Sequence, residues 1–330
     1  MTTTARLLAL LCVLALGCPL AKAASSKSSA PKVSGREYVP IADWASANKF
    51  TLRWLAPART LQVSDRLTKI IFTVDARADR TKAFINGIEV SLAFPVTYQG
   101  GKAYITQTDL THTINPILSP PRNSRGVKIK TICLDPGHGG RDPGFQVGSN
   151  NEKKYTLLLA QEVRELLQRA GFNVVMTRST DYYLSPEARP DVARKRKADL
   201  FVSLHFNAFS SRAVKGIETY CLTPAGAYSS NSGGEGVTRW VSGNRNNEKN
   251  MLLAYQVQRS LVKSLGGEDR GVKRARYKVL TEASVPAILV EGGFMSNPTE
   301  GRKIFDSAYR RQMARAIVDG IMAYKNAVNG

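Results

Sequence analysis

The chain has 330 residues and a formal net charge of +21, from 47 lysines and arginines against 26 aspartates and glutamates. Its length suits one large domain or two moderate ones, and the 43% hydrophobic fraction excludes a largely disordered chain. Such a basic surface favours anionic partners, among them anionic cell-wall polymers. No nucleic-acid recognition motif accompanies the charge, so we predict no nucleic-acid partner.

The first 23 residues have the composition of a secretory signal peptide. Arg6 precedes a short apolar run, and Ala21-Lys22-Ala23 has the small residues of a cleavage site. The run is shorter than the roughly 20 residues that a membrane helix needs, so no transmembrane anchor is expected. We therefore predict an exported protein, either periplasmic or extracellular in the cell wall. Lipoprotein anchoring at Cys18 is a minority alternative.

After a polar linker (24–35), residues 36–118 are predicted to form a small α+β or mostly β module. Its expected elements are a strand edge and short helix over 37–48, then strands at 50–54, 60–63, 69–74, 82–85 and 102–106. Asn86-Gly87 predicts a hairpin turn. We interpret His112 as a surface loop residue of this module. A second linker (119–126) follows.

From residue 127 to 330, predicted strands alternate with predicted helices. Strands are expected at 127–134, 173–177, 199–204, 216–222, 278–280 and 286–290, and helices at 152–170, 186–196, 251–265, 299–305 and 309–328. A long surface loop is expected over 224–250. This alternation predicts an open, mostly parallel twisted sheet with helices on both faces. Cys133 and Cys221 fall in strands, where a disulfide and two buried thiols both stay open.

Four side chains with metal or acid–base chemistry follow or flank these strands. His138 and His205 come after two strands, Glu291 ends a third, and Glu152 opens the helix at 152–170. Because ligands bind beyond the carboxyl ends of the strands in such sheets, the four are expected on one rim. Two imidazoles and one carboxylate can hold Zn²⁺ with a position open for water. A further glutamate can then transfer protons.

The motifs around these residues resemble one enzyme family. They are Leu134-Asp-Pro-Gly-His138-Gly-Gly-Arg-Asp-Pro-Gly144, Glu152, Ser203-Leu-His205-Phe-Asn207-Ala208, Gly216-Ile-Glu-Thr-Tyr220, Arg270-Gly-Val-Lys273 and Val290-Glu291-Gly-Gly-Phe-Met-Ser-Asn-Pro298. In order and spacing they are similar to the zinc-dependent N-acetylmuramoyl-L-alanine amidases of bacterial cell walls, over about 127–325.

The resemblance implies that His138, Glu152 and His205 bind one zinc ion in the catalytic domain and that Glu291 is the catalytic base. Asp135 and Asn207 would either support the histidines or cap turns. Peptidoglycan would be the substrate, cut between N-acetylmuramic acid and L-alanine. Some family members carry a helical insertion that blocks the zinc until an activator removes it. The segment between Leu222 and Met251 has little helical periodicity, so an open site is expected.

The module at 36–118 more loosely resembles the N-terminal-like domain of copper amine oxidases, without its copper chemistry. The similar segments are 37–42, 83–88 and 101–105. A role in positioning on the wall and a role as passive spacer both stay open. For the whole chain, two alternatives to the amidase remain: an inactive amidase-fold protein that binds cell wall, and a zinc amidase or peptidase acting on another amide.

Overall fold

The computed structural model describes residues 32–33, 35–74, 81–230, 236–237 and 239–329. The predicted signal peptide (1–23) and most of the polar linker lie outside the described residues, and so does Cys18. Within the described ranges, no helix combines the length and apolar character needed to cross a membrane.

The N-terminal part is built mainly of short antiparallel strands. Its elements are β1 (Lys32–Val33), β2 (Arg36–Pro40), α1 (Ile41–Ala47), β3 (Thr51–Ala56), β4 (Thr60–Ser64), β5 (Lys69–Thr73), β6 (Lys82–Ile85), β7 (Ile88–Ser91), β8 (Thr97–Gln99), β9 (Lys102–Thr106), α2 (Gln107–Asp109), the π-helical η2 (Leu110–Ile114) and α3 (Asn115–Leu118). The predicted turn at Asn86-Gly87 joins β6 to β7, because both residues have the positive φ that this hairpin requires.

The C-terminal part alternates strands with longer helices. Its elements are β10 (Thr131–Pro136), β11 (Gln146–Val147), β12 (Asn150–Asn151), α4 (Glu152–Arg169), β13 (Asn173–Met176), α5 (Ala188–Lys195), β14 (Leu200–Asn207), β15 (Ile217–Leu222), β16 (Ala227–Tyr228), β17 (Gly236–Val237), the 3₁₀ turn η3 (Ser242–Asn246), α6 (Asn247–Leu265), β18 (Asp269–Ala275), α7 (Lys278–Thr281), β19 (Ala287–Phe294), α8 (Pro298–Phe305) and α9 (Ser307–Asn329).

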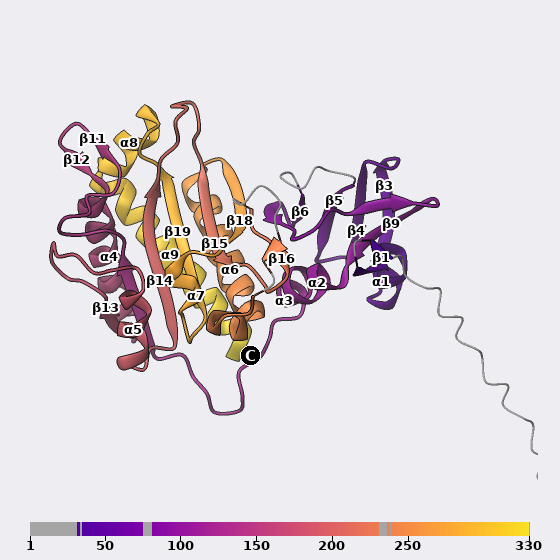
Figure 1. Ribbon diagram of the computed structural model, residues 1–330, viewed down its shortest axis with the longest axis horizontal. Helices are drawn as coiled ribbons and strands as arrows, with labels where there is room; N and C mark the ends of the chain where they lie inside the picture. The colour runs from indigo at the N-terminus through magenta and orange to yellow at the C-terminus, as the bar shows by residue number, and fades with distance from the viewer. Residues whose placement is uncertain (1–31, 34, 75–80, 231–235, 238, 330) are drawn as a thin grey trace, which may run out of the picture.

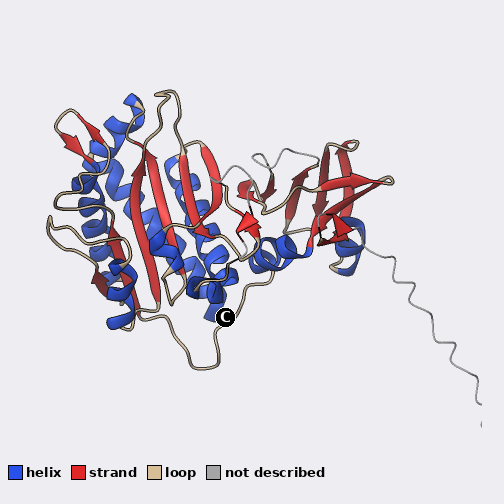
Figure 2. Cartoon of the chain, viewed as in Figure 1, coloured by secondary structure: helices blue, strands red, loops and turns tan. Residues whose placement is uncertain are grey.

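The principal sheet of the C-terminal part has the strand order β13-β10-β14-β19-β15-β18. All its neighbours are parallel except β15 and β19, so the predicted open, mostly parallel sheet is confirmed (Figure 1). Helices cover both faces (Figure 2). Ile132 and Leu134 pack with α4, α6 and α9, whereas Cys133 between them packs with α5 and α7. This alternation follows from the two-residue period of a strand.

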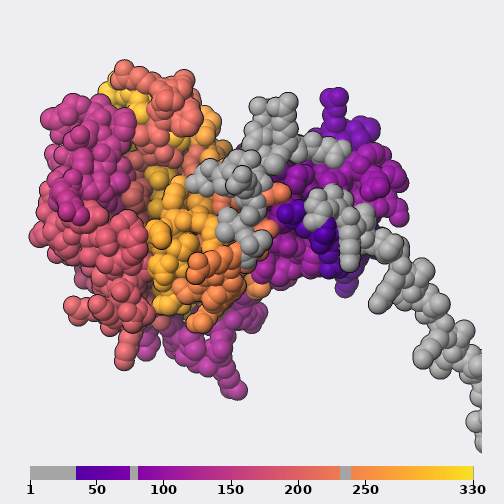
Figure 3. Space-filling model, viewed as in Figure 1, coloured from indigo at the N-terminus to yellow at the C-terminus, as the bar shows by residue number. Residues whose placement is uncertain are grey.

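The two parts lie side by side (Figure 3) and share one sheet. Strand β18 pairs in parallel with β7 through Val272 and Val90, which extends the sheet through β6, β5 and β4 to β3. The Glu89 amide donates to Asp269 Oδ2 over 2.8 Å. Arg274, which is 1% exposed, donates from Nη2 to the His112 carbonyl oxygen over 2.7 Å. The parts are therefore packed on each other as well as joined by the segment 119–126.

Several sequence predictions are wrong. Residues 278–281 form the helical turn α7 instead of a strand, since the amides of Leu280 and Thr281 both donate to Tyr277 O. A segment of three residues is too short to distinguish the two structures by its periodicity. The predicted loop at 224–250 ends early, because η3 begins at Ser242 and α6 at Asn247. Strand β18 was not predicted, since its charged residues mask the apolar pattern.

The structure corrects the prediction for His112 and decides between the two alternatives for the cysteines. His112 is half-buried in η2 instead of lying in a surface loop, and burial together with the charge of Arg274 lowers its pKa to about 4. Cys133 and Cys221 are both buried free thiols, so the alternative without a disulfide holds. Burial raises the pKa of both thiols, as expected for inert cysteines.

Candidate metal centre and active site

His138 lies in the loop after β10, close to His205 of β14. It has a left-handed backbone conformation with φ 62°, which is uncommon for a residue other than glycine. Arg189 Nη2 holds this loop by donating to the His138 carbonyl oxygen over 2.9 Å. A Cβ at Gly137 would come within 2.2 Å of His205 Cε1. Glycine at this position is therefore what allows the loop to approach the second histidine.

Glu152 is the first residue of α4, where the helix dipole favours a negative side chain. The N-cap Asn151 accepts a hydrogen bond from the Lys154 amide and fixes the start of the helix. Glu152 is 4% exposed and accepts from the amides of Phe145 and Phe206, each over 3.1 Å. Its carboxylate is thus held in place by the backbone on both sides.

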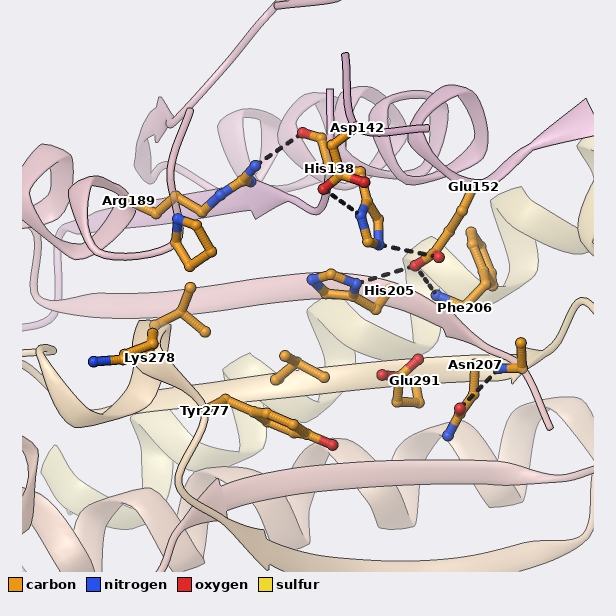
Figure 4. A pocket seen from close by; sticks show the side chains of 14 residues that line it. His138, Asp142, Glu152, Arg189, His205, Phe206, Asn207, Tyr277, Lys278 and Glu291 are labelled. Atoms are coloured by element: carbon orange, nitrogen blue, oxygen red, sulfur yellow. Dashed lines mark hydrogen bonds and ion pairs between the residues drawn. The ribbon is translucent and has the colours of Figure 1, made fainter. Parts of the chain in front are cut away.

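The structure brings His138, Glu152 and His205 together from a loop, a helix and a strand. His138 Nε2 lies 3.0 Å from Glu152 Oε2, and His205 Nδ1 lies 3.0 Å from Glu152 Oε1. One ligand atom from each residue lies within 4.8 Å of the others (Figure 4). This group could hold a metal ion, and two imidazoles with one carboxylate are a ligand set that suits Zn²⁺.

The charges of this group shift the pKa values of its members. Burial alone would lower the pKa of His138, but hydrogen bonds and charges from Glu152 and Asp142 raise it. Burial would raise the pKa of Glu152, yet its hydrogen bonds with the two histidines hold that pKa well below its usual range. Glu152 is therefore ionised at neutral pH, which is the form that binds a cation.

Glu291 lies on β19 directly beside His205, because the two residues are register partners of adjacent strands. It is 9% exposed, and its Oε2 has no hydrogen-bond partner among the described residues. Burial raises the pKa of Glu291 well above its usual value, and the charges of Glu152 and Glu218 add to the shift. A carboxyl group with a raised pKa is a candidate for proton transfer.

A charged network lies behind Glu291 on the next strands. Glu218 of β15 is the register partner of Glu291 and is 2% exposed. It accepts from Arg270 Nε and Lys273 Nζ of β18, each over 2.6 Å, and from the Tyr220 hydroxyl over 2.7 Å. These partners lower the pKa of Glu218 and keep it ionised. Its negative charge therefore lies next to Glu291 on the neighbouring strand.

All four predicted residues face one cavity of about 440 Å³. It is lined by His138, Asp142, Glu152, Pro186, Arg189, His205, Phe206, Asn207, Ala208, Tyr277, Lys278, Val279, Leu289 and Glu291. Figure 4 shows Glu291 on the strand next to His205, with Tyr277 and Lys278 at the side of the cavity away from Glu152. The described residues of 223–250 do not line it.

The structure gives Asp135 and Asn207 partners other than the histidines. Asp135 is fully buried and accepts from Thr177, Arg189 and Ser203. Asn207 Nδ2 donates to Glu218 Oε2 over 3.2 Å. Of the two predicted roles, the structure thus favours the turn cap for Asn207, whose Oδ1 accepts from the Ala208 amide over 2.8 Å, and shows no hydrogen bond from either side chain to a histidine among the described residues.

A further side chain in contact with a histidine, Asp142, was not predicted. Asp142 Oδ2 lies 2.8 Å from His138 Nδ1, which leaves Nε2 directed at Glu152. Its signal was available, because Asp142 follows His138 by four residues in the same glycine-rich loop. Glu218 was also missed, because its pairing with Glu291 depends on strand order.

Comparison with known proteins assigns the C-terminal part to a family. The sequence profile of the N-acetylmuramoyl-L-alanine amidases matches residues 132–323. The chain is 35% identical over 245 residues to N-acetylmuramoyl-L-alanine amidase AmiC of Neisseria meningitidis, which covers 67% of this chain and 58% of AmiC. It is 32% identical over 254 residues to AmiA of Escherichia coli, covering 69% of this chain and 87% of AmiA.

Solved structures give the same assignment. An N-acetylmuramoyl-L-alanine amidase from Clostridium difficile superposes with a TM-score of 0.51 and 32% identity, over 61% of this chain and 98% of that one. The superposed portion has the mixed sheet with helices on both faces seen here. The chain spans about 58% to 60% of the length of several curated relatives, so their similarity concerns a part of each.

Proposed function

The chain belongs to the N-acetylmuramoyl-L-alanine amidase family, and on this premise we propose that it is a zinc hydrolase of peptidoglycan. It cleaves the amide between the lactyl group of N-acetylmuramic acid and L-alanine. The observation that carries the proposal is the cluster of His138, Glu152 and His205 beside the buried carboxyl group of Glu291. One zinc ion per catalytic domain would be held by the first three side chains.

The residues fit a zinc ion on two grounds. The donor set of two imidazoles and one carboxylate is that of hydrolytic zinc sites. Glu291 Oε2 is buried without a hydrogen-bond partner, as expected for a group whose partner arrives with the substrate and water. Bound zinc would supply Lewis acidity, lowering the pKa of water toward about 7 and polarising the carbonyl group.

Glu291 performs the proton transfers in this mechanism. As water adds to the lactyl carbonyl carbon, the Glu291 carboxylate takes the proton that the water loses. When the carbon–nitrogen bond breaks, Glu291 returns this proton to the amine of L-alanine. Its raised pKa suits both steps, since the carboxyl group must hold the proton between them. Asp142 keeps the His138 ring oriented throughout.

We extend the proposal to the remaining parts of the chain. Residues 127–330 act as the catalytic domain, and 36–118 act as a module that positions it on the wall. The composition of residues 1–23 favours export to the periplasm or cell wall, and the net charge favours contact with anionic wall polymers. The low helical periodicity of the segment between Leu222 and Met251 favours activity without an activator.

Mass spectrometry of purified sacculi tests the proposal. Incubation with the zinc-loaded protein should release stem peptides that begin with a free L-alanine amine. A chelator should abolish the release, and added zinc should restore it. Intact sacculi with bound protein would favour the inactive wall-binding alternative. Cleavage at another amide would replace the substrate assignment.

A further inference from the structure

A second cavity, of about 640 Å³, adjoins the proposed active site. The helical turn α7 separates the two cavities, and its first residue, Lys278, lines both. Val279 faces the active-site cavity, whereas Thr281 lines the second one. The two cavities are therefore neighbours that share the wall formed by Lys278.

The second cavity is positively charged. Arg239, Arg276 and Lys278 line it together with one acidic residue, Glu282. The Arg276 guanidinium donates to the backbone carbonyl oxygens of Thr223 and Arg239, and none of the described carboxylates forms an ion pair with it. Burial and the charge of Arg239 lower the pKa of Arg276. A bound carboxylate would neutralise this pair of like charges.

An exposed aromatic side chain lies at the rim. Trp240 is 52% exposed, and the Arg245 guanidinium carbon lies 5.4 Å from its ring centroid. The backbone next to it is fixed, because Ser242 Oγ donates to Thr281 O over 3.0 Å. Gly243 is packed so closely that an added Cβ would lie 2.3 Å from Leu280 O. Trp240 thus offers a large exposed apolar surface just before an anchored turn, which suits contact with a ligand.

We propose that the second cavity binds the stem peptide of the substrate, with its carboxylates at Arg239 and Arg276 and its aliphatic portion against Trp240. This inference rests on the proposed function and names the part of the substrate that extends past α7. The substrate continues on both sides of the scissile amide, as the glycan on the carbonyl side and as the peptide on the amine side. The lactyl carboxyl group is consumed in the amide, so the glycan offers no carboxylate. The peptide beyond L-alanine carries several.

Binding of a free stem peptide tests the inference without catalysis. The probe is the tetrapeptide L-alanyl-γ-D-glutamyl-meso-diaminopimelyl-D-alanine, titrated calorimetrically into the full-length protein, with its carboxyl-amidated form as the matched ligand. We expect the free-acid peptide to bind more tightly. The double variant Arg239→Gln/Arg276→Gln should weaken it by roughly tenfold or more, as for loss of charge-assisted hydrogen bonds. Trp240→Ala should weaken both peptides.

Controls separate the cavity from general charge and folding effects. Arg315→Gln removes an exposed cation of α9 and should leave binding unchanged. Arg239→Gln alone changes an exposed side chain, so its effect does not depend on the packing of Arg276. Equal affinities of wild type and double variant for the free-acid peptide would overturn the inference. The inference would also be overturned if the double variant bound a longer glycan more weakly than wild type does but bound the peptide with unchanged affinity.

The failure of the proposed function gives a different result. If the peptide binds through Arg239 and Arg276 but sacculi stay uncut, the amidase assignment fails while the second cavity remains a peptide site. If sacculi are cut and the variants bind the peptide as wild type does, the inference fails and the amidase assignment stands.

Discussion

Two buried carboxyl groups, Glu291 of β19 and Asp109 of α2, lie in opposite kinds of surroundings. Asp109 is completely buried and accepts hydrogen bonds from the amides of Ala93 and Phe94 and the hydroxyls of Thr106 and Thr113. Glu291 is also buried, but its Oε2 has no partner in the described part of the chain. Burial raises the pKa of both groups.

The difference separates a structural carboxyl group from a chemical one. The four donors around Asp109 reduce the cost of its desolvation and tie the turn at Ala93 to η2, next to the junction with β18. An unpaired buried oxygen such as that of Glu291 stabilises nothing in the free protein. The position of Glu291 beside His205 and the cavity accounts for the unpaired oxygen, because water and substrate supply its hydrogen-bond partner during the reaction.

The largest effect is expected at the metal ligands. His138→Ala leaves two ligand side chains, so the protein should lose stoichiometric zinc and its turnover should fall to background. Metal analysis of the purified variant, with release of stem peptide from sacculi, measures both. His112→Ala is the matched control, since this histidine lies in η2 and should not affect the zinc content. One tightly bound zinc per His138→Ala molecule would remove His138 from the ligand set.

Glu291→Gln should lower turnover by about 10²- to 10⁴-fold, the range for loss of a general acid–base group. The variant should retain zinc and its fold, because Gln has nearly the same shape and no ligand is removed. Initial rates of peptide release at saturating zinc give the comparison. A rate equal to that of wild type would mean that another group transfers the protons.

Asp109→Asn should lower the free energy of unfolding by about 1–3 kcal/mol, since an amide donor then faces backbone and hydroxyl donors. Urea denaturation of the two proteins measures the difference. Turnover per folded molecule should stay at the wild-type value. A variant as stable as wild type would show that the hydrogen bonds to Asp109 do not stabilise the module.

The smallest effect should appear in the pH dependence of stability. The folded-state pKa of Glu291 lies above the ordinary value of 4.5, so its protonated form is the one compatible with burial. Its contribution to stability is complete below about pH 4.5 and is lost as pH rises through the folded-state pKa. Metal-free Glu291→Gln should therefore have a higher Tm than wild type at pH 8.

Calorimetric scans of the metal-free proteins between pH 4 and 8 would measure the difference in Tm between Glu291→Gln and wild type. This difference should disappear toward pH 4. Asp109→Asn gives the contrast, because it also turns one of the acceptor oxygens that the neighbouring donors require into a donor amide. A Glu291→Gln variant less stable than wild type at pH 8 would mean that the carboxyl group is satisfied in the folded protein.

Sequence patterns predicted most of the C-terminal fold. The long helices α4 and α9 carry regular apolar positions, and their residue ranges were predicted closely. Prediction failed where charge or brevity hid the pattern. Strand β18 carries Asp269, Arg270 and Lys273, whose partners are on other strands and helices. Residues 278–281 are too few to show a period.

For the candidate site, the sequence by itself determined which side chains are available and on which rim they gather. His138 follows β10, whereas His205 and Glu291 lie in the C-terminal halves of β14 and β19, so the rule that ligands gather at the carboxyl ends of parallel strands still placed them on one rim. Only the tertiary structure decided how they are supported. Asp142 orients His138, and Glu218 is the register partner of Glu291 on the adjacent antiparallel strand β15.

The docking of the N-terminal module on β18 and the cationic cavity beyond α7 were likewise decided by tertiary structure. Strand order and loop packing bring together residues that are distant in sequence, such as Arg239 with Arg276 and Glu89 with Asp269. The periodicity of a local segment does not predict such pairs, because they depend on which segments become neighbours when the whole chain is packed.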